Sequence, residues 1–335
     1  MDSISELRQD LVSGDWVLIA TGRGKRPHDF RVEKHGTLRQ SPADCPFEDP
    51  QATGHGAPLL TLPEEGRWLV QAVPNKFPAV AHGECSVTHK HGPYAWWEGV
   101  GFHEVIIYRD HAKALADFSD EEIAMALEAF RQRYIAHRED DCIEYISLFH
   151  NHGTEAGASI AHPHSQIIAI PVIPPDVGRS LKGSRAYFEA QGSCVHCAIL
   201  TFECETRERL IEETEHFVAF APYASRTSFE VRIFPKKHTP SFRQTDPVEL
   251  REAAILLRNV LKRLKTGLND PALNFFIHTA PVRGEDFPYY HWHIEIIPKT
   301  AIWAGFELGT GIEISTIAPE GAAKHLKGVL LSRTQ

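Results

Sequence analysis

The feature that most constrains the fold is an order of sequence patterns that this 335-residue chain contains twice. Each half begins with a cysteine-containing segment, continues through two apolar strand-like runs, a helical stripe and a third apolar run, and ends with a histidine pair. In the first half these are Cys45-Pro46-Phe47-Glu48, residues 68–73, 104–108, 123–134 and 143–149, and His162-Pro163-His164. In the second half they are Cys194-Val195-His196-Cys197, residues 217–220, 229–234, 250–264 and 274–278, and His291-Trp292-His293. A repeated order at this scale indicates a duplicated unit. We therefore predict an α+β fold in which each half is an antiparallel sheet with one long helix.

Local signals place the long helix of each half. Ser119 and Glu122 form a capping box in front of the first stripe, and Asp246-Pro247 is a good N-cap and first-turn pair for the second. Between the halves, residues 172–192 contain Pro174-Pro175, which is typical of a break in structure. This break divides the chain into predicted domains 1–175 and 176–335. Residues 301–311 are expected to form a loop and residues 319–331 a short amphipathic helix.

Composition narrows the class of protein. A hydrophobic content of 42% with 24% charged residues is typical of a globular protein, and the net charge of −9 argues against nucleic-acid or membrane-surface binding. Residues 1–10 are polar and lack a signal-peptide core, so a cytoplasmic location is expected. In such a reducing compartment the six cysteines are expected to be thiols or metal ligands rather than disulfides.

The segment His162-Pro163-His164-Ser165-Gln166 carries the strongest chemical signal, because it opens an apolar run that is predicted to be a strand. Side chains two apart on a strand share a face, so His162, His164 and Gln166 are expected to project the same way. A neutral imidazole can attack phosphorus and form a phosphohistidine-type intermediate, and an amide can donate to a non-bridging oxygen as charge builds. The alternative is a chance cluster in a chain with 20 histidines.

The second half contains a set of residues with the donor chemistry of a structural zinc site. The set consists of Cys194, Cys197, His238 and one histidine of the His291/His293 pair, with His291 taken as the ligand. Tetrahedral zinc takes two thiolates and two imidazoles, and a C-x-x-C segment supplies both thiolates from one tight turn. The long spacing to the histidines excludes a zinc finger. The alternative is a free C-x-x-C pair without metal.

The first half offers a related but less regular set. Its members are Cys45, Glu48, His111 and His162. Glu48 stands where a second cysteine would complete the repeat, and a carboxylate can also ligate zinc. The alternative is a metal-free site held by hydrogen bonds. In either case the set is expected to support the neighbouring His164 rather than to be the chemical centre.

Over nearly its whole length the chain resembles the galactose-1-phosphate uridylyltransferases of the histidine-triad superfamily. The segments that carry the resemblance are residues 10–20, 23–27, 74–78, 110–113, 151–166, 291–293 and 305–307. The resemblance implies two histidine-triad-like halves related by a pseudo-twofold duplication. It also implies a ping-pong nucleotidyl transfer in which His164 attacks the α-phosphorus of a nucleotide sugar, sugar 1-phosphate leaves, and an acceptor then takes the nucleotide.

The resemblance also implies roles for individual residues. Gln166 would bind an α-phosphate oxygen, Glu307 would contact the hexose, and His162 would ligate zinc with Cys45 and His111. The phosphate path would be lined by Asn151, Gly157 and Ser159, and the nucleotide-binding segments contain Arg23, Arg26, Asn75 and Phe77. These roles suit the residue types, because guanidinium groups bind phosphate, glycines let backbone N–H groups face an anion, and an aromatic ring can stack on a base. The alternatives are a solvated basic turn, an ordinary loop and a core phenylalanine.

Three departures from the family pattern leave the substrate open. Glu48 replaces the expected cysteine, and the complete Cys2His2 set resembles the branch that includes plant-type ADP-glucose phosphorylases. That branch also has a segment like residues 305–311. The lysine that contacts the hexose in the galactose enzymes falls at Ala301.

The leading hypothesis is an enzyme of carbohydrate metabolism resembling UDP-glucose–hexose-1-phosphate uridylyltransferase. Its partners would be a nucleotide sugar and a sugar phosphate, its cofactor zinc, and its assembly a homodimer, as is common among relatives. The alternatives are an ADP-glucose phosphorylase-like adenylyltransferase, a histidine-triad hydrolase, and a non-catalytic zinc-stabilised nucleotide-binding protein. A complete His-Pro-His-Ser-Gln segment favours catalysis, and Glu307 favours transfer over hydrolysis.

Overall fold

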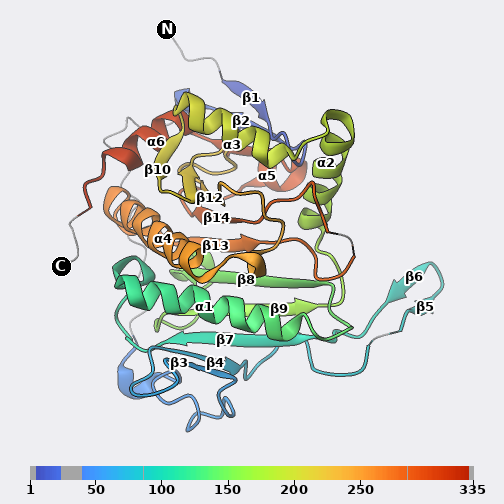
Figure 1. Cartoon of the computed structure of the whole chain (residues 1–335), viewed down its shortest axis with the longest axis vertical. Helices are drawn as coiled ribbons and strands as arrows, with labels where there is room; N and C mark the ends of the chain where they lie inside the picture. The colour runs from blue at the N-terminus through green and yellow to red at the C-terminus, as the bar shows by residue number, and fades with distance from the viewer. Residues whose placement is uncertain (1–4, 24–39, 86, 285, 332–335) are drawn as a thin grey trace.

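The computed structural model of the chain describes residues 5–23, 40–85, 87–284 and 286–331. Within them, a ten-stranded antiparallel sheet runs through the centre of the molecule (Figure 1). From one edge to the other its strands are β10 (Leu210–Glu213), β11 (Phe217–Phe220), β12 (Val231–Pro235), β14 (His293–Pro298), β13 (Leu273–His278), β8 (Tyr145–His152), β9 (His164–Ile170), β7 (Phe102–Tyr108), β4 (Val70–Pro74) and β3 (Leu60–Leu62). Each half of the chain contributes five adjacent strands, and the halves meet where β8 pairs with β13. The antiparallel α+β architecture predicted from the sequence is therefore present.

Two long helices cover one face of this sheet. They are α1 (Asp120–His137) and α4 (Pro247–Gly267), which lie side by side in front of the strands in Figure 1. Both predicted N-termini are confirmed: Ser119 and Asp246 each accept a hydrogen bond from the third residue of their helix and complete a capping box. The predicted apolar stripes of both helices are buried against the sheet in the main core.

Two segments expected to be irregular are helical. Pro174-Pro175 begins a helix instead of breaking the structure, because Pro175 is the first residue of α2 (Pro175–Gln191), where a missing N–H costs no hydrogen bond. Val177 and Leu181 of α2 pack on Tyr145, Tyr289 and Tyr290, beside the sheet face opposite α1 and α4. The predicted loop 301–311 contains the short helix α5 (Gly305–Thr310), which ends at Gly311 in the left-handed conformation with φ of 70°.

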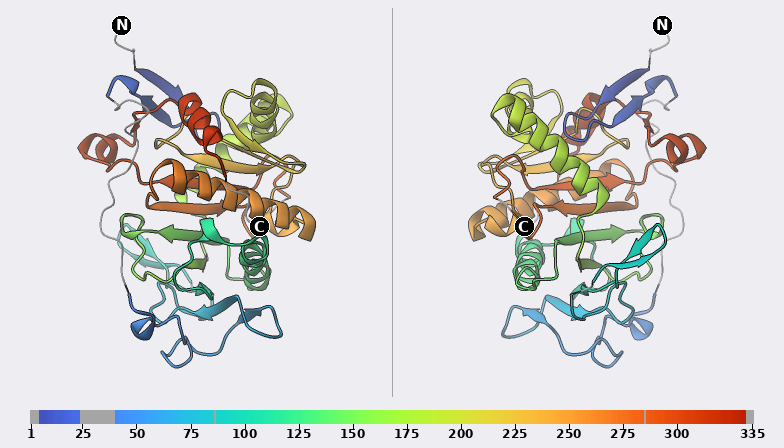
Figure 2. Two further views of the ribbon diagram at one scale, coloured as in Figure 1. Left: turned by 90° about the vertical axis from the view of Figure 1, so that its left-hand side faces the viewer. Right: turned by 90° about the vertical axis from the view of Figure 1, so that its right-hand side faces the viewer.

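The remaining elements lie around the sheet. In the described part of the chain the other helices are α3 (Val195–Thr206) and α6 (Pro319–Gly328), and α6 confirms the helix expected after residue 319. The same part contains the 3-10 turns η1 (Thr21–Arg23), η3 (Pro42–Asp44), η4 (Leu115–Asp117), η5 (Thr154–Ala156) and η6 (Phe242–Gln244). A small sheet contains β1 (Glu6–Gln9), β2 (Trp16–Ile19) and β15 (Glu313–Ser315). Figure 2 shows its N-terminal strands at the end of the molecule formed by the second half, where Asp10 pairs with Arg232.

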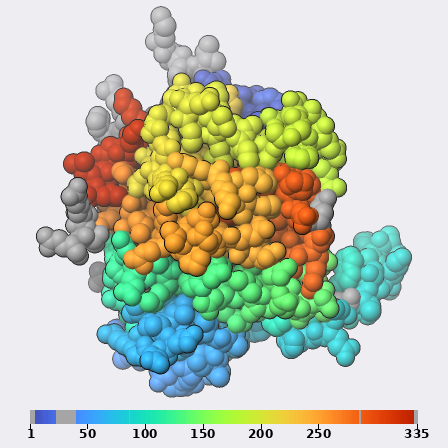
Figure 3. Space-filling model, viewed as in Figure 1, coloured from blue at the N-terminus to red at the C-terminus, as the bar shows by residue number. Residues whose placement is uncertain are grey.

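A two-stranded hairpin projects from the first half. It consists of β5 (His89–His91) and β6 (Tyr94–Trp96), and Figure 3 shows it as an arm that stands clear of the main body. No helix in the described part of the chain is both long enough and apolar enough to cross a bilayer.

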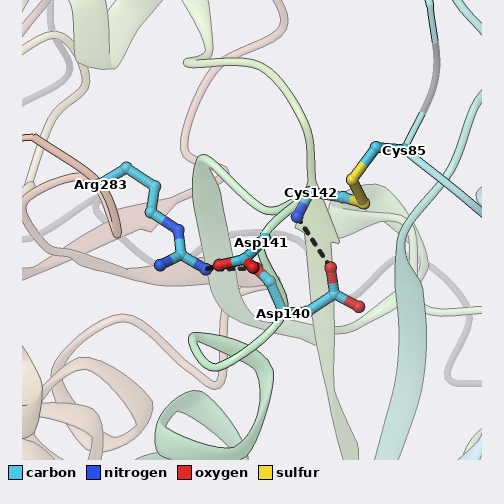
Figure 4. Close-up of a disulfide and its surroundings, with 5 residues drawn as sticks. All are labelled: Cys85, Asp140, Asp141, Cys142 and Arg283. Atoms are coloured by element: carbon cyan, nitrogen blue, oxygen red, sulfur yellow. Dashed lines mark hydrogen bonds and ion pairs between the residues drawn. A yellow bond between two sulfur atoms is a disulfide. The ribbon is translucent and has the colours of Figure 1, made fainter.

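The expectation that all six cysteines are thiols or metal ligands is wrong for two of them. Cys85, near the base of the hairpin arm, forms a disulfide with Cys142, which lies between α1 and β8 (Figure 4). The Cα atoms are 5.0 Å apart, although 57 residues separate them in sequence. Asp140 accepts a hydrogen bond from the Cys142 backbone N–H, and Asp141 pairs with Arg283. The sequence did not indicate this pairing because the contact arises only from tertiary folding.

Candidate active site and metal centres

Strand β9 presents two different faces. Ser165, Ile167 and Ala169 point toward α1 and α4, and the last two belong to the main core. Side chains alternate along a strand, so His164 and Gln166 point to the opposite face of the sheet, which those helices leave uncovered. His164 and Gln166 thus share a side, as predicted, whereas His162, for which the same side was predicted, lies in the bend before β9.

The His164 imidazole is held in one tautomer. Its Nδ1–H donates to the backbone oxygen of His162 at 2.9 Å, so Nε2 carries the free lone pair. His164 is 7% exposed, and its ring meets that of Phe47 edge to face with a centroid distance of 5.0 Å. Burial lowers the pKa of His164, which favours the neutral, nucleophilic form. Nε2 has no hydrogen-bond partner within the described residues, so it is free to react.

A buried polar chain supports the other side of this strand. The Ser165 hydroxyl lies 2.6 Å from the Tyr108 hydroxyl and 3.0 Å from His150 Nδ1. Burial raises the pKa of Tyr108 and lowers that of His150 well below its usual value, so both groups stay neutral. A neutral chain of this kind anchors the strand without placing a charge behind His164. The sequence analysis did not identify Tyr108 or His150, and the alternation of strands β7 and β8 was the signal that could have done so.

His162 faces the first candidate metal centre. Its Nε2–H donates to the backbone oxygen of Tyr108 at 2.5 Å, so Nδ1 carries the lone pair. Nδ1 lies 3.5 Å from Cys45 Sγ and 3.6 Å from a carboxylate oxygen of Glu48. His162 is completely buried. The lone pair of His162 therefore lies beside Cys45 and Glu48.

The four residues of the first predicted metal set lie together. The ligand atoms of Cys45, His111 and His162 all fall within 4.8 Å of one another, and Glu48 Oε1 is 3.1 Å from His111 Nδ1. His111 Nε2–H donates to the Gln40 backbone oxygen, which leaves Nδ1 as the ligand atom. That Nδ1 is buried and has no hydrogen bond in the described structure. An orphaned buried nitrogen among a thiol, a second imidazole and a carboxylate fits a zinc ion.

The second predicted set also converges. The ligand atoms of Cys194, Cys197, His238 and His291 fall within 4.8 Å of one another. Cys194 is the N-cap of α3 and Cys197 lies in its first turn, so a helix start provides the predicted tight turn. Cys197 Sγ is 3.3 Å from His238 Nδ1 and 3.7 Å from His291 Nδ1. The neighbouring Cys197 and the two imidazoles lower the pKa of Cys194, so one sulfur is held as a thiolate.

His293 starts β14 as His164 starts β9, but its surroundings differ. Its Nδ1–H donates to the His291 backbone oxygen at 3.1 Å, and its ring is stacked on Phe234 and His278 at centroid distances of 4.5 and 4.8 Å. Two residues later stands Glu295, where the first half has Gln166. Burial alone would raise the pKa of Glu295, but Arg226 and Arg232 hold it well below the usual value. A fixed carboxylate here would repel a phosphate.

The remaining predicted site residues occupy several places. Gln166 Oε1 lies 2.8 Å from Nε2 of His103, a residue of β7 that the sequence analysis did not identify. Asn75 Oδ1 accepts from the Phe77 backbone N–H, and the Phe77 ring is 82% exposed. The expected phosphate path has one residue on β8, Asn151, which accepts from Asn274 of the neighbouring strand β13. Its other two residues lie in the loop before β9: Gly157, which has φ of 89°, and the exposed Ser159.

Two other predicted residues, Arg23 and Glu307, lie on elements outside the central sheet. Arg23 is the last residue of η1, which follows a strand of the small sheet, and Arg26 lies outside the described residues. Glu307 lies on α5, where its carboxylate accepts from the Ala304 backbone N–H at 3.0 Å. Exposed apolar residues lie near it in the sequence, including Ile302, Phe306 and Leu308.

Comparison with known proteins identifies relatives that span the chain. A family model described as the N-terminal domain of galactose-1-phosphate uridyl transferase matches residues 1–174, and a domain of unknown function, DUF4921, matches residues 99–333. ADP-glucose phosphorylase of Arabidopsis thaliana is 35% identical over 333 residues, covering 98% of this chain and 93% of the relative. Galactose-1-phosphate uridylyltransferase of Thermotoga maritima is 31% identical, covering 96% and 98%.

Solved structures agree with the sequence comparison. The crystal structure of an ADP-glucose phosphorylase from Arabidopsis thaliana with bound ADP-glucose superposes with a TM-score of 0.84 at 34% identity, covering 98% of this chain and all of that chain. A structure of a uridylyltransferase gives a TM-score of 0.74 at 27% identity, covering 97% of each chain. The chain therefore belongs to the galactose-1-phosphate uridylyltransferase family of nucleotidyltransferases.

Proposed function

We propose that this protein moves a nucleoside monophosphate from a nucleoside-diphosphate sugar to an acceptor phosphate through a nucleotidyl intermediate on His164. The observation that carries the proposal is the state of the His164 ring. It is buried and neutral, its Nδ1–H is engaged by the His162 backbone oxygen, and its Nε2 lone pair lies on the same side of β9 as Gln166. A nucleophile held in one tautomer beside an amide suits attack on phosphorus.

The proposed reaction has two displacements. The Nε2 lone pair forms a bond to the α-phosphorus, the bond from that phosphorus to the bridging oxygen breaks, and the electron pair leaves with sugar 1-phosphate. The ring then carries a positive charge, which the Nδ1–H bond to the His162 oxygen stabilises. An oxygen of the acceptor phosphate next attacks the α-phosphorus and releases His164 with its Nε2 lone pair restored. The acceptor is a sugar 1-phosphate or inorganic phosphate.

The roles of the surrounding residues are part of the proposal. Gln166 donates to a non-bridging α-phosphate oxygen, and Glu307 contacts the hexose. The phosphate path is formed by Asn151, Gly157 and Ser159, and the nucleotide-binding segments hold Arg23, Arg26, Asn75 and Phe77. The protein would act as a homodimer, and the exposed apolar side chains beside Glu307 support a role for α5 in contacts beyond a single chain. A cytoplasmic location stays a prediction. The Cys85–Cys142 disulfide counts against it, because disulfides are rare in a reducing compartment.

We assign catalysis to residues 1–175 and a supporting role to residues 176–335, as two histidine-triad-like halves related by duplication. The strand order supports the duplication, because β3-β4-β7-β9-β8 and β10-β11-β12-β14-β13 read inward from opposite edges in the same sequence of elements. The ionised Glu295 and the stacked ring of His293 support a single catalytic half, since neither suits a nucleophile that approaches a phosphate.

Zinc would be held at two places. Cys45, His111 and His162 would form one centre, with Glu48 as a further ligand. Cys194, Cys197, His238 and His291 would form the other. Zinc bound there supplies structural cross-linking. At the first centre, the chain's own contribution is to fix His162, whose backbone oxygen in turn orients His164.

The base and the sugar distinguish two candidate functions. The sequence favours a uridylyltransferase acting between UDP-glucose and a hexose 1-phosphate. An ADP-glucose phosphorylase-type adenylyltransferase is the second candidate. It is supported by the 35% identity and TM-score of 0.84 to the Arabidopsis protein, and by the complete Cys2His2 set and the 305–311 segment.

An intact-mass screen tests the proposal. The protein is incubated without acceptor with UDP-glucose, UDP-galactose, ADP-glucose and GDP-mannose, and the expected result is a covalent adduct of one nucleoside monophosphate with one of them. His164→Ala should form no adduct, whereas the matched variant His293→Ala should form it. Release of free nucleotide from the adduct without acceptor would instead identify a hydrolase. An adduct that survives in His164→Ala would contradict the assignment of the nucleophile.

A further inference from the structure

We propose that His103 is a positioning residue that fixes the orientation of the Gln166 amide, so that its NH₂ group rather than its oxygen faces the reacting phosphate. The inference rests on the proposed function of Gln166 and adds a residue to that site. His103 belongs to β7, the strand next to β9, and neither its position nor its neighbours in sequence marked it as functional.

The geometry of the two strands places both side chains on the reactive face. In the antiparallel register, His103 pairs with Ile168 and Val105 with Gln166. Ile106 and Tyr108 of β7 lie in the core under α1 and α4, whereas Val105 packs with Cys45 and Ile107 on the other face. His103 alternates with Val105 and Ile107, so it stands on the same face as His164 and Gln166.

The backbone decides which nitrogen of His103 carries the proton. The Ala79 N–H donates to Nδ1 at 3.0 Å, and a backbone N–H can only be a donor. Nδ1 must therefore be the acceptor, and the neutral ring carries its proton on Nε2. This assignment depends on a main-chain group and not on the choice of a side-chain amide orientation.

The proton on Nε2 in turn decides how the Gln166 amide lies. Nε2–H donates to Gln166 Oε1 at 2.8 Å. The Asn75 amide nitrogen, 3.0 Å from the same Nε2, is itself a donor and offers no acceptor, so Gln166 is the partner that satisfies the ring. With its oxygen engaged, the amide turns its NH₂ group away from His103. Within the described residues that NH₂ group has no hydrogen-bond partner, so it remains available to donate to a ligand.

The consequence for catalysis follows because the oxygen and the NH₂ group of an amide are similar in size and can exchange places. A glutamine amide can turn by 180° with little steric cost, and in the turned state its oxygen would face the phosphate oxygens and repel them. Only the donor orientation stabilises the charge that builds on the phosphate, and donors of this kind act best when they are oriented before the reaction. His103 is thus the group that excludes the unproductive orientation.

Two isosteric substitutions separate the two hydrogen bonds of His103. In His103→Asn, the side-chain oxygen can take the place of Nδ1 and accept from Ala79, but nothing reaches Gln166. In His103→Gln, the amide nitrogen can take the place of Nε2 and donate to Gln166 Oε1. We expect the single-turnover rate of adduct formation to fall about 10- to 100-fold in His103→Asn. This rate loss is smaller than the loss caused by deleting a donor to the charged oxygen altogether. The rate in His103→Gln should lie within a few-fold of the wild-type rate. The control His91→Asn, at an exposed position, should form the adduct at the wild-type rate.

A double-mutant cycle with Gln166→Ala provides the second readout. The His103→Asn loss should disappear in the Gln166→Ala background, because no amide is left to orient. Equal rates in His103→Asn and wild type, equal losses in His103→Asn and His103→Gln, or an undiminished loss in the Gln166→Ala background would each overturn the inference. Absence of an adduct in the wild-type protein with every nucleotide sugar would overturn the proposed function, and this inference with it.

Discussion

At the scale of single residues, His164 and His293 have the same backbone contact and different chemistry. Each donates from Nδ1 to the oxygen of the histidine two positions earlier, so each has its lone pair on Nε2. What separates them is the residue two positions later, because Gln166 can donate to a phosphate oxygen while the ionised Glu295 can only repel it. This difference, together with the stacked ring of His293, supports confining the proposed chemistry to the first half.

A buried carboxylate in β7 gives a pH-dependent contribution to stability. Glu104 is 3% exposed and accepts from the guanidinium of Arg133 at 2.6 and 2.8 Å, and His137 Nε2 lies 2.8 Å away. Burial alone would raise the pKa of Glu104, but these two partners on α1 lower it overall. A lowered folded-state pKa stabilises the protein above the unfolded value of about 4.5, and this stabilisation is lost as the pH falls through the folded value.

We predict that Glu104→Gln lowers the free energy of unfolding at pH 7 by about 3 kcal/mol, because it leaves Arg133 without its charged partner. The difference from wild type should shrink as the pH is lowered below about 4.5. Urea unfolding at pH 7, 5 and 3.5 measures both effects, with the exposed Glu205→Gln as the control. A difference that is constant with pH would show that the charge of Glu104 does not contribute.

At the scale of elements, the two long helices illustrate how local sequence sets a boundary. Asp246 Oδ1 accepts from the backbone N–H groups of Val248 and Glu249, both at 2.9 Å, and Pro247 occupies the first helical position. The interactions span four residues, which is why α4 could be placed from sequence. By contrast, α2 begins at Pro175 within a segment read as a break, because a proline pair is compatible with both a stop and a start.

Removing the N-cap of α4 should lower the free energy of unfolding only modestly. Asp246→Ala is expected to reduce the free energy of unfolding by about 1 kcal/mol, since two N–H groups lose their acceptor. The control is Val248→Ala, which changes an exposed side chain in the same turn and should stay within about 0.5 kcal/mol of wild type. Thermal or denaturant unfolding of the three proteins makes the comparison, and an equal loss in both variants would argue against capping as the cause.

At the scale of the whole molecule, side chains from distant segments hold the second half together. Cys194 and Cys197 start α3, His238 follows β12, and His291 precedes β14. One cluster therefore joins three separate segments beside one end of the neighbouring strands β12 and β14. If these residues bind zinc, the ion closes long loops whose ends the chain alone must otherwise bring together.

We expect Cys194→Ser to lose one equivalent of zinc per chain and to lower the melting temperature by several degrees. Cys204→Ser is the matched control, because Cys204 is a free cysteine on the same helix that lies outside the cluster, and it should keep the wild-type metal content. Elemental analysis of the purified variants with thermal unfolding measures both. Unchanged zinc in Cys194→Ser would exclude a metal at this centre.

The sequence by itself determined the local structure and the types of chemistry available. The capping residues, the helical stripes, the central strands and the antiparallel α+β class follow from interactions within a few residues or from a periodicity of side chains. The members of both candidate metal sets could also be recognised, because the residue types and their repeated order are visible in the sequence. These features needed no knowledge of which segments meet.

Tertiary structure alone decided the pairings between segments that are distant in sequence. Cys85 meets Cys142 across 57 residues of sequence. His103 meets Gln166, and Tyr108 meets His150 through Ser165, because β7, β8 and β9 lie side by side. The tautomers of His103 and His164 depend likewise on backbone groups that folding brings to each ring. A sequence lists donors and acceptors, but a hydrogen bond or a disulfide requires distances of a few ångströms, and only the packed sheet sets those distances.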